Sequence, residues 1–133
     1  QMDTLVAMGV PLSTGPAAEE NPDLILEGII GYSLDGAPQG AAAELIDWAH
    51  RLEAPILSLD VPAGFDANAG LALDPTIRAM ATLSVALPKN GLLTSDCVGE
   101  LYVADISVPP QAYERLGIEF RTPFSDGDIL RLR

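Results

Sequence analysis

The sequence has few basic residues, and this scarcity excludes several classes of function. Of its 133 residues only seven are Lys or Arg, against 19 Asp and Glu, which gives a formal net charge of −12 at pH 7. Nucleic-acid binding needs a cluster of basic side chains to neutralise phosphates, and here the seven are spread thinly along the chain. An anionic membrane surface is disfavoured for the same reason. We therefore expect neither nucleic acid nor membrane as a partner.

Cysteine and long apolar runs are also scarce. The single cysteine, Cys97, excludes an internal disulfide, which suits a reducing cytoplasm. The lone histidine, His50, is too distant in sequence to suggest a base for Cys97. No apolar run approaches the roughly 20 residues of a membrane-spanning helix, and the start shows no signal-peptide pattern. These absences predict a cytoplasmic location.

What the chain does contain is enough apolar material for one core. Apolar residues make up 48% of the sequence, so disorder is disfavoured, and the length suits a single domain over residues 1–133. The apolar run at 23–30 is typical of a strand buried in a parallel sheet, and residues 41–52 carry the apolar stripe of a helix. With a strand at 55–60 these form a βαβ unit. The pattern predicts an α/β fold with a mostly parallel, Rossmann-like sheet.

The remaining segments give weaker patterns. We expect strands at 10–12, 82–87, 101–106 and 118–120, helical turns at 2–8, 75–80 and 111–116, and a peripheral tail at 128–133.

Polar and glycine-bearing loops follow three of the predicted strands. Ligands of open α/β sheets bind beyond the carboxyl ends of the strands, which makes these loops candidate sites. The first is GYSLDG at 31–36, the second is DVPAGFD at 60–66, and the third, PKNGLL at 88–93, carries the only lysine, Lys89. Spacing alone leaves plain connecting loops, a capping role for Asp60 and a solvated Lys89 as open alternatives.

Four segments in order resemble one known family. They are EGIIGYS at 27–33, LDVPAGFD at 59–66, PKNGL at 88–92 and GELYVADISVP at 99–109. Together they resemble the NAD(P)H-hydrate epimerase family, the YjeF N-terminal domain. The resemblance implies a three-layer Rossmann-like α/β fold. It also implies that the chain is N-terminally incomplete, since it would form the C-terminal two thirds of the family domain and lack an upstream N-N-G-G-D-G loop.

The resemblance further implies an isomerase that interconverts the R and S epimers at C6 of hydrated NADH or NADPH. An ADP- or ATP-dependent NAD(P)H-hydrate dehydratase would be its functional partner. Among the implied site residues, Asp60 is the one strand-tip titratable group able to assist, so we predict that it is catalytic. From its charge alone, we predict that Lys89 neutralises a substrate phosphate. The implied substrate-binding residues are Gly31, Tyr32, Ser33, Leu34, Asp35, Gly36, Ala37 and Asp60.

A potassium ion is also implied by the resemblance. The family holds it with an Asn of the upstream loop, an acid at the position of Glu27 and a Ser at position 63. This chain has Glu27 where the family has Asp, and Ala63 where it has Ser. Because a monovalent cation needs several oxygen ligands, we expect these changes to weaken the site.

Two questions stay open on the sequence alone. The chain is either an active epimerase or a catalytically degenerate relative that binds a nucleotide or a protein partner. It could also form a homodimer through aromatic side chains, although scattered aromatics more often belong to a core. The aromatic residues in question are Tyr102, Tyr113, Phe120 and Phe124.

Overall fold

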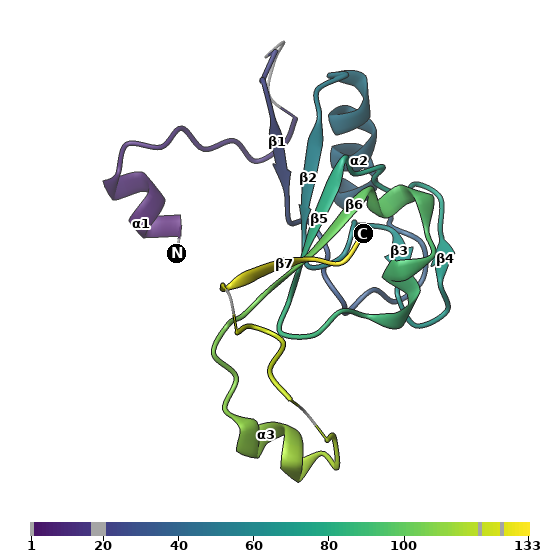
Figure 1. Ribbon diagram of the computed structural model, residues 1–133. Helices are drawn as coiled ribbons and strands as arrows, with labels where there is room; N and C mark the ends of the chain where they lie inside the picture. Colours follow the sequence, from purple (N-terminus) through teal and green to yellow (C-terminus); the bar gives the residue numbers. More distant parts are fainter. Residues whose placement is uncertain (1, 17–20, 120, 126) are drawn as a thin grey trace.

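The computed structural model describes residues 2–16, 21–119, 121–125 and 127–133, and a five-stranded sheet forms its centre (Figure 1). The strand order is β1 (Ile25–Glu27), β2 (Ile56–Leu59), β5 (Ala81–Val85), β6 (Glu100–Ala104) and β7 (Ile129–Arg131). The first four strands are parallel, and β7 runs antiparallel to β6. The predicted α/β class and mostly parallel sheet are confirmed.

Helix α2 (Ala41–Arg51) covers one face of this sheet at β1 and β2. Its buried side chains, Ile46 and Ala49, form an apolar cluster with Ile56 of β2, and Ile25 of β1 packs against the cluster. Burying such side chains contributes about 1.5–3 kcal/mol each. The helix predicted at 41–52 and the strand predicted at 55–60 are therefore confirmed, and their packing fixes where the loops at the ends of β1 and β2 begin.

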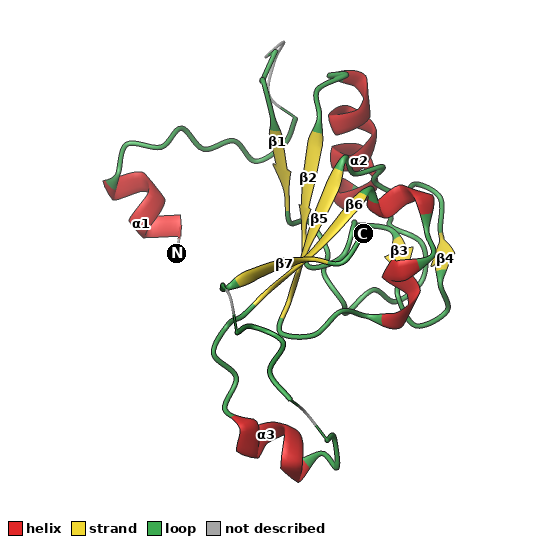
Figure 2. Ribbon diagram, in the orientation of Figure 1, coloured by secondary structure: helices red, strands yellow, loops and turns green. Residues whose placement is uncertain are grey.

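Short elements cover the same face at β5 and β6 (Figure 2). They are the hairpin β3 (Phe65–Asp66) and β4 (Leu71–Ala72) and the 3-10 helices η1 (Asn90–Leu93) and η2 (Asp96–Val98). The sheet register places Ser58, Thr82 and Leu101 on this face, and Leu101 is fully buried in a second apolar cluster. Sequence patterns missed these elements, because each is too short to show a periodic spacing of apolar residues.

The opposite face of the sheet is exposed in the described part of the chain. Leu26 is 74% exposed and Leu59 is 53% exposed, and with Leu57 and Leu83 they line an apolar depression of about 480 Å³. Helix α1 (Met2–Ala7), which confirms the helix predicted at 2–8, stands apart from the sheet with exposed side chains (Figure 1). None of the described helices is long and apolar enough to cross a bilayer.

Several predicted elements are wrong. Residues 10–12 form no strand, and residues 75–80 form no helical turns. Helical hydrogen bonds are absent there because Ile77, Ala79 and Met80 donate their N–H groups to carbonyls of three other segments. Ile118 and Glu119 are not in a strand, and Phe120 lies outside the described residues. The tail predicted to be peripheral contributes β7 to the main sheet.

The C-terminal aromatic residues do not share one environment. Tyr113 is 7% exposed within helix α3 (Pro110–Arg115), which confirms the helix predicted at 111–116. Tyr102 donates a hydrogen bond to Glu100, and this bond raises the pKa of Tyr102. Phe124 is half-buried. The homodimer stays a prediction.

Candidate active site

Asp60 follows β2 directly, at the carboxyl edge of the sheet. Its backbone is in the left-handed region with φ 69°, which is uncommon for a residue other than glycine. The Asp60 N–H donates to the carbonyl of Leu83 at 2.8 Å, and this bond holds the turn against β5. Such strain persists only where the surroundings fix it, and it gathers at functional sites. The turn therefore sets the direction of the carboxylate.

Lys89 pairs with that carboxylate from the segment after β5. Its Nζ contacts Oδ1 of Asp60 and also lies 3.2 Å from both Ser84 Oγ and the Val85 carbonyl oxygen. The Lys89 and Asp60 side chains are 18% and 20% exposed. The structure thus joins two residues that the sequence placed in separate loops, and Ser84 is an additional member that sequence reasoning missed.

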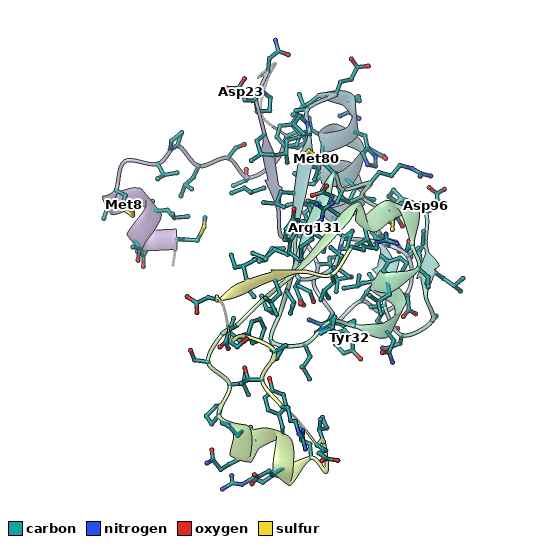
Figure 3. The ribbon with its side chains drawn as sticks, viewed as in Figure 1. Met8, Asp23, Tyr32, Met80, Asp96 and Arg131 are labelled. Atoms are coloured by element: carbon teal, nitrogen blue, oxygen red, sulfur yellow. The ribbon has the colours of Figure 1, made fainter. Side chains whose placement is uncertain are left out.

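The first two residues of the GYSLDG loop form a wall beside this pair. A Cβ at Gly31 would lie 3.3 Å from Asp60 Oδ2, so glycine leaves room for the second carboxylate oxygen. The Tyr32 hydroxyl donates to Asn68 Oδ1 at 2.6 Å. Tyr32, Asn68 and Lys89 line a cavity of about 290 Å³, and Figure 3 shows Tyr32 at this edge of the sheet. The cavity is therefore lined by Lys89, the ion-pair partner of Asp60.

The rest of that loop lines a different cavity, of about 360 Å³, at the start of α2. Residues 33–37 contribute to it together with Ala42 of the first helical turn. Gly40 is the N-cap residue of α2. Because glycine has no side chain, the cap residue makes no side-chain hydrogen bond to the first N–H groups of the helix. Uncapped N–H groups at a helix N-terminus favour an anion such as phosphate. Residues of the GYSLDG loop therefore line two different cavities.

Glu27, at the end of β1, has a different environment. Its side chain is buried, at 4% exposure. Oε1 accepts the Ile29 N–H at 2.7 Å, while Oε2 accepts the Ser58 hydroxyl at 2.7 Å and the Ala63 N–H at 3.3 Å. Buried polar groups are normally satisfied in this way, and among the described residues no buried side-chain N or O lacks a partner.

The DVPAGFD loop is packed too tightly to move freely. A Cβ at Gly64, where φ is 91°, would lie 2.3 Å from the Pro75 carbonyl oxygen. Ile77 N–H donates to the Ala63 carbonyl at 2.8 Å and Leu73 N–H to that of Gly64 at 2.9 Å. Hydrogen bonds from Leu73 and Ile77 therefore hold this loop, and with it the Ala63 N–H that points at Glu27.

The residues do not fit the potassium site that the resemblance implies. Ala63 has no side-chain oxygen, is fully buried and belongs to an apolar cluster with Ile77. Hydrogen-bond donors already surround both oxygens of Glu27. Within the ranges described, no three His, Cys, Asp or Glu side chains converge as metal ligands.

Three site residues were not found from the sequence. Ser58 and Ser84 are fully buried, and each interrupts an apolar strand, which was a usable signal for a polar partner inside the fold. Asn68 lies in the turn between β3 and β4, and it gave no such signal.

Comparisons with known proteins agree with this architecture. The model of the family described as YjeF-related protein N-terminus matches residues 1–91. The chain is 47% identical to the NAD(P)H-hydrate epimerase of Dehalogenimonas lykanthroporepellens over 83% of its length and 45% of that protein. It is 34% identical to the bifunctional NAD(P)H-hydrate repair enzyme Nnr of Moorella thermoacetica over 65% of its length and 17% of that protein. The chain thus spans less than half the length of these relatives.

The fold comparison gives the same result. The crystal structure of yeast ynu0, YNL200c, superposes with a TM-score of 0.67 over 83% of this chain and 46% of the yeast chain. The sequence identity is 24%, so this likeness concerns the fold alone.

Proposed function

This chain belongs to the YjeF-related protein N-terminus family, and from that premise we propose that it acts in epimerising hydrated NADH and NADPH. The observation that carries the proposal is the Asp60–Lys89 pair beside a cavity at the carboxyl edge of the sheet. Support also comes from the 47% identity to a relative that bears the name NAD(P)H-hydrate epimerase.

Asp60 would move the protons in this reaction. Epimerisation at C6 requires that a C–O bond break and re-form on the other face of the ring, or that the ring open and close. In the first route the departing hydroxyl takes up a proton and the entering water gives one up. In the second route the C6 hydroxyl gives up its proton as the C6–N1 bond breaks, the nitrogen side takes one up, and closure reverses both transfers, so neither route consumes an oxidant or reductant. A carboxyl held at a strand tip suits this exchange, and Oδ2 of Asp60, which faces Gly31, is not the oxygen that pairs with Lys89.

Lys89 would position Asp60 in this scheme. Its ammonium group is already engaged by Oδ1 of Asp60, Ser84 Oγ and the Val85 carbonyl. An ammonium group with these three partners supports a role in fixing the carboxylate better than the phosphate role expected from charge. The substrate phosphates would instead lie in the cavity of residues 33–37, near the uncapped start of α2.

The functional partner would be an NAD(P)H-hydrate dehydratase. The Moorella thermoacetica relative is named as a bifunctional NAD(P)H-hydrate repair enzyme, and this name supports a link between the two activities. A cytoplasmic location follows from the same assignment, and the lone cysteine is consistent with it.

A coupled assay tests the proposal. Pure R-hydrate is mixed with an S-specific dehydratase and its nucleotide cofactor, with and without this protein, and recovery of NAD(P)H is followed by absorbance. We expect the protein to accelerate recovery above the spontaneous rate, and the exposed-residue variant Asp96→Asn to accelerate it equally. Absence of acceleration would refute catalysis, and hydrate binding without acceleration would establish the degenerate binding module instead.

A further inference from the structure

We propose that this protein holds no potassium ion at the end of β1, and that hydrogen-bond donors of its own chain take the place of the cation around Glu27. The proposal does not rest on the epimerase assignment, because it concerns how one buried charge is compensated. It departs from the potassium site that the family resemblance implies.

The donors around Glu27 carry the first part of the argument. The Ile29 N–H, the Ser58 hydroxyl and the Ala63 N–H all direct hydrogens at the carboxylate. These hydrogens bring partial positive charge to the side of the oxygens where a cation would bind. A potassium ion there would be repelled by the same hydrogens, and it would have to displace bonds that are already made.

The burial of Glu27 carries the second part. An ionised carboxylate that is 4% exposed must be compensated, because removing it from water is costly. Ion pairs in the described ranges join Lys89 to Asp60 and Arg131 to Glu100, and neither involves Glu27. Hydrogen bonds to a charged group are roughly twice as strong as neutral ones. The three donors therefore suffice as compensation without a metal.

The surroundings of Ala63 carry the third part. Potassium in proteins is held where several oxygens replace its hydration shell. At position 63 the side chain is a methyl group at 0% exposure, packed with Ile77 and Ala79 in an apolar cluster. Hydrocarbon thus occupies the side on which a serine hydroxyl would complete a cation's oxygen shell.

Ser58 is the positioning residue of this arrangement. It lies on β2 opposite Glu27 in the sheet register, and two residues before Asp60. Its hydroxyl bond to Oε2 ties the end of β1 to the strand that carries Asp60. The ends of β1 and β2 are therefore joined directly by a side chain of the sheet.

Thermal unfolding of the purified protein tests the cation claim directly. The protein is exchanged into choline chloride and then compared in KCl, NaCl and choline chloride at equal ionic strength. Because a ligand that binds the native state raises its stability, a bound potassium ion would raise Tm as KCl is added. We expect the three salts to give the same Tm at each concentration. A concentration-dependent rise specific to KCl would overturn the proposal.

A pair of variants tests the donors. Ser58→Ala removes a buried hydroxyl that donates to a carboxylate, whereas Thr82→Val removes a buried hydroxyl that donates to the neutral Val98 carbonyl at 2.8 Å. We expect the Tm loss of Ser58→Ala to be roughly twice that of Thr82→Val, and KCl to restore none of it. An equal or smaller loss, or recovery in KCl alone, would contradict the proposal.

Discussion

The ends of β1 and β2 each carry a carboxylate, and the two carboxylates have opposite environments. Glu27 is 4% exposed and accepts three hydrogen bonds from its own neighbourhood. Asp60 is 20% exposed, sits on a strained backbone and pairs with a lysine beside a cavity. The difference teaches that two acids at neighbouring strand ends can differ in role, and the catalytic role is proposed only for Asp60. The pairing of Asp60 with a lysine that lines a cavity separates the two carboxylates.

The largest expected effect comes from Asp60→Asn. Asparagine tolerates the left-handed backbone at this position and keeps the shape of the side chain, so the fold should persist. The variant cannot exchange a proton, and we expect kcat/KM for epimerisation to fall by about 10²–10⁴-fold. The coupled assay measures the rate, with Asp96→Asn as the matched control. A rate within threefold of the wild type would show that Asp60 is not the working residue.

Lys89→Met should have the next largest effect. The change removes the charge and keeps a chain of similar length, so Asp60 loses a charge-assisted bond of about 1.5–3 kcal/mol. We expect kcat to fall by about 10–100-fold with little change in KM. Steady-state kinetics distinguishes the positioning role of Lys89 from a phosphate-binding role. Loss of a phosphate contact would raise KM and leave kcat unchanged.

Glu27→Gln tests the structural role of the other carboxylate. The Ser58 hydroxyl and the Ala63 N–H both donate to the Glu27 carboxylate. An amide NH2 group is also a donor, so in the variant donor faces donor and one buried polar group loses its partner. We expect this to lower the free energy of unfolding by about 1–3 kcal/mol. Urea unfolding should show a lower midpoint with an unchanged slope. Activity per folded molecule should fall by less than about tenfold. An unchanged midpoint would contradict the structural role of Glu27.

The smallest effect is expected for Tyr32→Phe. The variant loses one hydroxyl bond to Asn68 at the rim of the cavity, worth about 0.5–1.5 kcal/mol. Because this bond joins two protein groups, it affects KM only through the orientation of Tyr32 and Asn68, so we expect a rise in KM of at most about 2–10-fold. Tyr102→Phe is the matched control, since it loses a hydroxyl bond of the same length to Glu100 on β6. Equal KM values for the two variants would show that Tyr32 does not take part in substrate binding.

The strong periodic patterns predicted the centre of the fold. The apolar strands and the stripe of α2 gave β1, α2 and β2 in order, because their side chains bury a continuous core. Residues 75–80 were mispredicted, because their conformation depends on carbonyls that come from three distant segments. Local pattern carries no information about such partners.

The candidate site was predictable in its loops and not in its pairings. The sequence marked Asp60 and Lys89 as separate strand-end residues, and the parallel register of β2 and β5 brings them together. The roles of Ser58 and Ser84 depend on which face of the sheet is buried, and this emerges only when α2 and the short elements pack against it.

One pair of measurements tests the contrast between the two carboxylates most directly. The epimerisation rate and the free energy of unfolding are determined side by side for Asp60→Asn and Glu27→Gln. We predict that Asp60→Asn loses its activity while it remains folded, and that Glu27→Gln has a lower free energy of unfolding but keeps most of its activity when folded. Folded Glu27→Gln without activity, or Asp60→Asn with wild-type activity, would contradict the account.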